Sequence, residues 1–154
     1  MNKNIYVSET ITEHQLNDVY SDPYILKVGH DSRPAAIIKH PNVSYLSAWI
    51  DNQFAGAFMI IKFSAVEFEL HALLKKSAIL QSRQLGKACL KWAFDNHQIL
   101  RVTAYVIDGL DAAKNYCLKL GFKYEGCRRN ACVQKNIVKD VHILGMTRTD
   151  WSLS

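Results

Sequence analysis

The chain has 154 residues, enough for one domain with its own hydrophobic core and too few for two, so we predict a single domain over residues 1–154. Hydrophobic residues make up 49% and charged residues 21%, proportions that argue against disorder. The formal charge of +5 suits a nucleic acid or a polyanionic cofactor as partner, but no long basic run supports nucleic-acid binding.

The sequence gives no sign of export, membrane insertion or metal binding. The N-terminal segment lacks the apolar run of a signal peptide, and the longest apolar stretch, Phe54 to Ile61, falls short of the roughly 20 residues that span a bilayer. Neither the cysteines nor the histidines show metal-ligand or C-x-x-C spacing (Cys89, Cys117, Cys127, Cys132; His14, His30, His40, His97, His142). We therefore predict a cytoplasmic protein without a metal, in the host cytoplasm if a phage encodes it.

The first elements are a short strand at Ile5–Val7 and a helix over Glu13–Tyr20. Thr12 is followed three residues later by Gln15, the spacing of a capping box, in which each side chain satisfies the other's free amide. From Tyr24 to Pro41 the pattern predicts no more than a second short helix and a loop.

Three strands are expected next, at Val43–Ile50, Phe54–Phe63 and Val66–Leu74, with a hairpin turn at Asp51–Gln53. The third strand alternates strictly. It places Glu67, Glu69 and His71 on one face and the apolar side chains between them on the other.

The period then changes to that of a helix over Ser82–Asn96, where apolar residues recur at i, i+3, i+4, i+7 and i+8. A strand at Arg101–Ile107 follows, and then a helix that ends at Gly121, a residue suited to a left-handed cap. Two final strands, about Phe122–Asn130 and Asp140–Arg148, are expected on either side of a polar loop, VQKNIVK. This order predicts a mixed sheet with helices packed on it.

The C-terminal part carries the most specific pattern. Starting at Ala112 it reads AAKNYCLKLGFKYEGCRRNACVQKNIVKDVHILGMTRTDW. The element order and these residues resemble the GNAT superfamily of acyl-CoA-dependent N-acyltransferases, over about Val43 to Trp151. The matching positions are Lys119 to Phe122, Glu125, Gly126, Arg128, Asp140, Met146, Arg148, Asp150 and Trp151. The likeness is strongest to the ribosomal-protein alanine acetyltransferase-like branch, and small acetyltransferase-like proteins of tailed phages have the same compact layout.

The resemblance implies an α/β fold, of mixed α+β type. A central, mostly antiparallel sheet would be splayed in the middle and carry helices on both faces. It also implies acetyl-CoA as co-substrate. Family members carry Q/R-x-x-G-x-G/A at a helix start, where backbone amides and the helix dipole hold the pyrophosphate. Here Gln81 and Gly86 match, while Gln84 replaces the middle glycine and either points away or fills the pyrophosphate space. Arg83 and Lys87 can pair with the phosphates, and Leu85 completes the segment.

The catalytic groups are expected on the strand before this helix. By resemblance, a backbone amide near Leu73 or Leu74 would donate to the thioester carbonyl. Glu69 or His71 would act as general base, unless this face is simply solvated or the two side chains form a structural hydrogen bond.

The general acid is harder to assign. The family's usual tyrosine position holds Cys117, which helical spacing makes a buried small residue, and Leu110 stands where an asparagine commonly opens the helix. Tyr116 is therefore the candidate acid, although a tyrosine on a helix is more often a core aromatic.

Two functions fit these observations. The first is an N-acetyltransferase that acts on a primary amine of a protein, peptide or small molecule, by direct attack in a ternary complex. The second is a catalytically inactive GNAT-like binding or assembly module with a protein partner, for example in a phage particle; Gln84 and Cys117 favour this alternative. An exposed edge strand would also allow a homodimer.

Overall fold

The computed structural model of the chain describes residues 2–29 and 35–154. The strands are β1 (Ile5–Ser8), β2 (Val43–Ile50), β3 (Gln53–Lys62), β4 (Glu67–Leu74), β5 (Arg101–Ile107), β6 (Lys123–Gln134) and β7 (Ile137–Thr147). The helices are α1 (Glu13–Ser21), α2 (Pro23–Gly29), the 3₁₀ helix η1 (Lys76–Gln81), α3 (Ser82–Asn96), α4 (Asp111–Leu120) and α5 (Arg148–Ser152). Helix α2 is the short helix predicted after Tyr24, and residues 30–34 of that segment lie outside the described residues. Within the described ranges, every helix is too short or too polar to cross a membrane.

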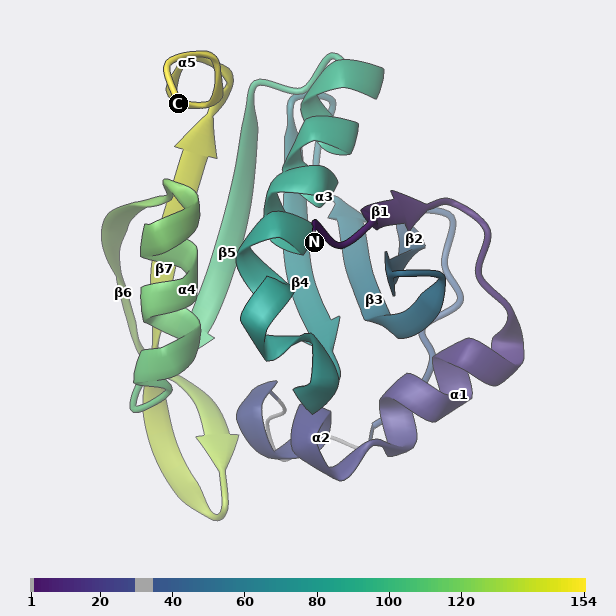
Figure 1. The fold of residues 1–154 in the computed structure, drawn as a ribbon. Coiled ribbons are helices and arrows are strands. Elements are labelled where there is room, and N and C mark those ends of the chain that lie inside the picture. Colours follow the sequence, from purple (N-terminus) through teal and green to yellow (C-terminus); the bar gives the residue numbers. More distant parts are fainter. Residues whose placement is uncertain (1, 30–34) are drawn as a thin grey trace.

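The described strands form one seven-stranded sheet in the order β1-β2-β3-β4-β5-β7-β6 (Figure 1). All neighbouring pairs are antiparallel except β4 and β5, which are parallel. These two strands pair only at Glu67–Glu69 with Arg101–Thr103. Strand β4 stays paired with β3 up to Leu74, and β5 stays paired with β7 up to Ile107. The sheet is therefore closed at one end of this junction and splayed at the other.

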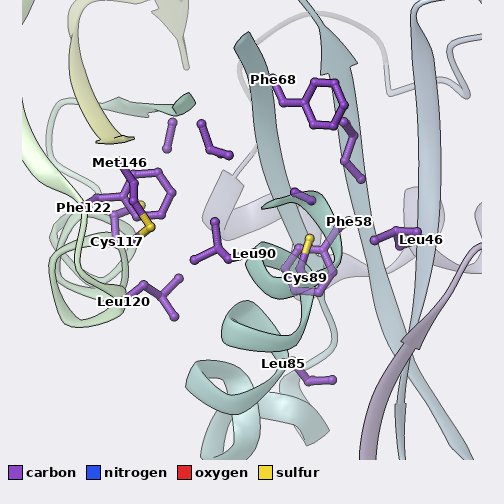
Figure 2. Close-up of a cluster of buried hydrophobic side chains, with 14 of the residues drawn as sticks. Leu46, Phe58, Phe68, Leu85, Cys89, Leu90, Cys117, Leu120, Phe122 and Met146 are labelled. Carbon is purple, nitrogen blue, oxygen red and sulfur yellow. The ribbon is translucent and has the colours of Figure 1, made fainter. Parts of the chain in front are cut away.

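Helices cover both faces of the sheet, as the alternation of buried residues on the strands requires. On one face, α3 and α4 pack against the main core, in which α3 contributes Leu85, Cys89 and Leu90 (Figure 2). On the other face, Val19 of α1 and Ile25 of α2 pack against Ala57 of β3 and form a smaller cluster. On this second face, the described helices α1 and α2 lie against β3 and β4.

The local signals in the sequence correspond to real caps and turns. Thr12 and Gln15 form the predicted capping box, and Gly121 caps α4 with a φ of 108°. The first hairpin turns on Asp51 and Asn52, whose φ values of 49° and 62° are positive. Two successive positive φ angles match the right-handed twist of the flanking strands, which explains a turn of two residues instead of the three expected.

The expected polar loop VQKNIVK is wrong. Strands β6 and β7 run on through it and pair up to Gln134 and Ile137, so that Lys135 and Asn136 alone make the turn. Their φ values of 51° and 63° are again those of a tight hairpin turn. The polar composition reflects two exposed strands instead of a loop, and the long hairpin extends beyond the neighbouring strands (Figure 1).

The C-terminal pattern R-x-D-W fastens the end of α3. The guanidinium of Arg148 donates to the backbone oxygens of Phe94 (3.0 Å), His97 (2.6 Å) and Ile99 (2.9 Å). Asp150 caps the short helix α5 through Thr147, and the ring of Trp151 stacks on Phe94. Arg148 thus satisfies carbonyl groups that a helix end leaves without partners.

Replacement of Arg148 by alanine should therefore destabilise the fold by about 2–4 kcal/mol, because three backbone acceptors lose a charged donor. Urea unfolding followed by circular dichroism measures the change. Arg129→Ala is the matched control, since Arg129 is exposed on β6 and its loss should stay within about 0.5 kcal/mol. Equal effects of the two substitutions would contradict this account of Arg148.

Candidate active site

The splay between β4 and β5 opens into a cleft of about 770 Å³. Its walls include side chains from both faces of these strands: Leu70 and Ala104 from the core face, and His71, Leu73 and Tyr105 from the opposite face. The cleft therefore passes through the sheet. One end lies against α3 and α4, and the other lies between α2 and the β6–β7 hairpin.

His71 and Glu69 form a hydrogen-bonded pair beside this cleft. Nε2 of His71 lies 2.6 Å from Oε1 of Glu69, and the two side chains are 32% and 19% exposed. A carboxylate accepts the bond, so Nε2 carries a proton; in the neutral form of the imidazole, Nδ1 then keeps its lone pair. His71 lines the cleft and Glu69 does not. The imidazole is thus the group that a molecule in the cleft can reach.

Glu67, the third residue of this face, holds the closed end of the junction. Its carboxylate accepts a hydrogen bond from Thr103 (2.6 Å) and lies 3.6 Å from the guanidinium of Arg101, which also pairs with Glu125. A side chain at Gly145 would collide with Arg101 and Glu125 where they cross β7. Sequence periodicity placed Glu67 on the right face but gave no sign of this network, because its partners come from β5 and β6.

The end of β4 presents one backbone amide to the cleft. Lys75 donates its amide to Ala55 of β3 (2.9 Å). Successive amides of a strand point to opposite sides, so the amide of Leu74 points away from β3 and towards the gap. Of the two candidates Leu73 and Leu74, the register therefore favours Leu74 as the donor.

The predicted anion-binding segment lies at the start of α3. Gln81 occupies the N-cap position, and Arg83, Gln84 and Lys87 are all on the surface of the first turns. Gln84 is not among the residues that line the cleft. The first turn of α3 contains no acidic residue, and the helix dipole adds positive potential there. The segment before it is the 3₁₀ helix η1, in which the backbone oxygen of Ile79 accepts the amide of Ser82.

Gly86 serves helix packing. A β-carbon at this position would overlap Tyr116 Oη and lie 2.8 and 2.9 Å from the two terminal carbons of Leu120. Leu85 beside it is fully buried in the core. The last glycine of the expected phosphate-binding pattern is therefore required here by the close approach of α3 and α4.

Tyr116 and Cys117 are both largely withdrawn from solvent. The hydroxyl of Tyr116 donates to the backbone oxygen of Ser82 (2.8 Å), and burial raises the pKa of the phenol well above its ordinary value. Burial also raises the pKa of the Cys117 thiol to about 11. Both side chains line the cleft, but a hydroxyl already committed to a carbonyl is poorly placed to give up its proton. The assignment of Tyr116 as general acid stays a prediction.

Four lysines that line the cleft were not predicted: Lys75 after β4, Lys27 on α2, and Lys135 and Lys139 on the hairpin. No sequence pattern joins α2 to a hairpin more than 100 residues away, so only the fold brings them together. As for metals, the described residues contain no group of three or more His, Cys, Asp or Glu side chains that could hold an ion, and His30 lies outside them.

No family model and no curated protein matches the chain. Several solved structures, however, share its fold. A spermidine N-acetyltransferase from Vibrio cholerae, crystallised with CoA and spermine, superposes with a TM-score of 0.82 at 11% identity, covering 96% of this chain and 98% of its own. A protein from T. thermophilus described as an acetyltransferase gives a TM-score of 0.77 at 15% identity, covering 99% and 90%. The chain has the fold of these acetyltransferases, and the GNAT fold predicted from the sequence is confirmed.

Substitution of Gly86 by alanine should destabilise the protein by about 1–2 kcal/mol, because overpacking against Tyr116 and Leu120 outweighs the gain in helix propensity. Removal of the Tyr116 hydroxyl relieves part of that overlap. Gly86→Ala combined with Tyr116→Phe should therefore cost less than the sum of the two single changes, as measured by denaturant unfolding. Additive changes in the free energy of unfolding would show that residues 86 and 116 do not interact sterically.

Proposed function

We propose that the protein is an N-acetyltransferase that transfers an acetyl group from acetyl-CoA to a primary amine by direct attack in a ternary complex. The observation that carries this proposal is the cleft that passes through the sheet at the β4–β5 splay. Such a cleft lets two reactants enter from opposite faces and meet beside one strand. The fold shared with acetyltransferases supports the assignment but does not establish the activity.

The residues around the cleft fit an acyl-CoA. Its lining is mainly apolar along β4, β5 and α4, which suits an extended pantetheine arm, and it reaches Ser82 at the start of α3. There Arg83 and Lys87 supply positive charge, and backbone amides beyond Ser82 are available to phosphate oxygens. Gln84 is exposed and does not line the cleft, so its side chain leaves the part proposed for the pantetheine arm unobstructed.

The chemistry that acetyl-CoA supplies is an activated thioester carbonyl. His71 removes the proton of the attacking amine through Nδ1, and Glu69 holds the imidazole in the required tautomer through Nε2. The amide of Leu74 donates to the carbonyl oxygen, where negative charge develops during attack. The cleft walls keep these groups close together. The N–C bond forms as the C–S bond breaks, and CoA leaves as a thiolate that takes up a proton from the imidazolium of His71 or from water. The reaction therefore needs no covalent attachment to the protein.

Acetyl-CoA binding is the first test. At a hundredfold excess over its Kd, a ligand specific to the folded state stabilises it by about 2.7 kcal/mol, which raises the unfolding temperature by several degrees. We expect such a rise with millimolar acetyl-CoA and with free CoA. No rise with either would contradict the proposal and favour the alternative of a binding or assembly module.

The second test concerns the base. His71→Ala should lower kcat by about 10²- to 10⁴-fold while acetyl-CoA still raises the unfolding temperature, and Glu69→Gln should lower kcat less. Glu67→Gln is the matched control on the same face of β4, because Glu67 bonds to Thr103 outside the cleft. It should lower stability and leave kcat largely unchanged. A His71→Ala protein with full activity would exclude this residue as the base.

A further inference from the structure

The end of the cleft between α2 and the β6–β7 hairpin is lined by lysines. Lys27 comes from α2, and Lys135 and Lys139 come from the hairpin. A fourth lysine of the cleft, Lys75, is already paired with Asp18 of α1. Against these, one acidic residue, Asp111, lines the described part of the cleft. Even without Lys135, Lys27 and Lys139 outnumber this single carboxylate, so the lining carries an excess of positive charge.

Lys139 is held in position at this end. Its Nζ donates to Oε1 of Gln134 (3.0 Å), a side chain that is 7% exposed. A β-carbon on Gly109 would lie 3.7 Å from the same Nζ, so the ammonium reaches from the hairpin to the turn after β5. A neutral amide accepts its hydrogen bond. Within residues 2–29 and 35–154, neither Lys139 nor Lys27 belongs to an ion pair.

Two carboxylates near this end are engaged elsewhere. Asp108 lies within electrostatic range of Lys139, but its carboxylate bonds to His142 (2.8 Å). Glu69 bonds to His71. A molecule that places its amine at His71 and extends towards the hairpin therefore meets the ammonium groups of the lysines there. A cationic molecule is repelled by them and an anionic one is attracted.

We propose that the acceptor is an amine that carries carboxylate groups close to its nucleophilic nitrogen, and that polyamines are disfavoured. This inference rests on the proposed acetyl transfer and names its substrate class. The proposed substrate class differs from that of the spermidine N-acetyltransferase described above. The two chains share a fold but are 11% identical in sequence. The carboxylates can belong to a free acidic amino acid or to an acidic peptide with a free N-terminus.

The experiment compares acidic, neutral and cationic acceptors. Peptides that begin Ser-Glu-Glu, Ser-Gln-Gln or Ser-Lys-Lys are assayed for release of CoA thiol and for acetylated product by mass spectrometry. Glutamate and spermidine are assayed in the same way, which separates a peptide from a small-molecule acceptor. We expect kcat/KM for the Ser-Glu-Glu peptide to exceed that for the Ser-Lys-Lys peptide by about tenfold or more, or kcat/KM for glutamate to exceed that for spermidine by the same factor. The difference should shrink at high salt.

Charge reversal provides the internal check. Lys139→Glu and Lys27→Glu should each shift the preference towards the cationic acceptor, through KM more than kcat. Lys3→Glu, an exposed lysine outside the cleft, makes the same charge change and should leave the preference as it was. Acetyl-CoA affinity of each variant is measured by calorimetry without any acceptor.

The outcomes separate this inference from the proposed function. Cationic acceptors favoured over acidic ones, or no difference among the three peptides, would overturn the inference while acetyl-CoA binding and acetyl transfer stand. A Lys139→Glu protein that loses affinity for acetyl-CoA would also overturn it, since the lysine would then serve the CoA. Absence of acetyl-CoA binding in the unaltered protein would instead remove the proposed function itself.

Discussion

The short parallel contact between β4 and β5 is the constraint on which the rest of the structure depends. The two strands hydrogen-bond only at Glu67–Glu69 and Arg101–Thr103, and the polar network around Arg101 holds that end closed. Beyond it, each strand remains paired with its outer neighbour, so the sheet keeps its order while its centre opens. The backbone amide of Leu74 and the imidazole of His71 face the cleft because β4 has lost its partner on that side.

Much of this arrangement follows from local sequence pattern. Strict alternation predicts that Glu69 and His71 lie on one face of a strand, because a period of two fixes which side chains share a face. The structure has them on one face, and His71 lines the cleft there. Long-range features could not be predicted in this way. Neither the network around Arg101 nor the lysines of α2 and the hairpin have any spacing in the chain that reveals them. Only the turn end of the hairpin, Val133 to Lys139, is predicted as a loop, because its polar residues are typical of loops; in the structure Gln134 is buried and Lys135 and Asn136 alone make the turn.

Most of the C-terminal residues that resemble the GNAT family have structural roles. Arg148 fastens the C-terminal end of α3, Asp150 caps α5, and Trp151 stacks on Phe94. These three residues do not line the cleft, whereas Leu120 and Phe122 of the same pattern do. A specific sequence pattern can therefore identify a fold without identifying the reaction, since a shared fold does not carry an activity by itself. The groups proposed to act in the reaction, His71 and the amide of Leu74, lie on β4 instead.

The contact between Gly86 and Tyr116 has a consequence for how related sequences can diverge. The two positions share one space between α3 and α4, with Leu120 as its third boundary. A larger residue at position 86 fits only where position 116 or 120 has become smaller, so these sites are free to change together and constrained when changed alone. An alignment of close relatives should then show correlated substitutions at positions 86, 116 and 120. Glycine at position 86 would accompany a tyrosine across the gap even in lineages that have ceased to bind a nucleotide.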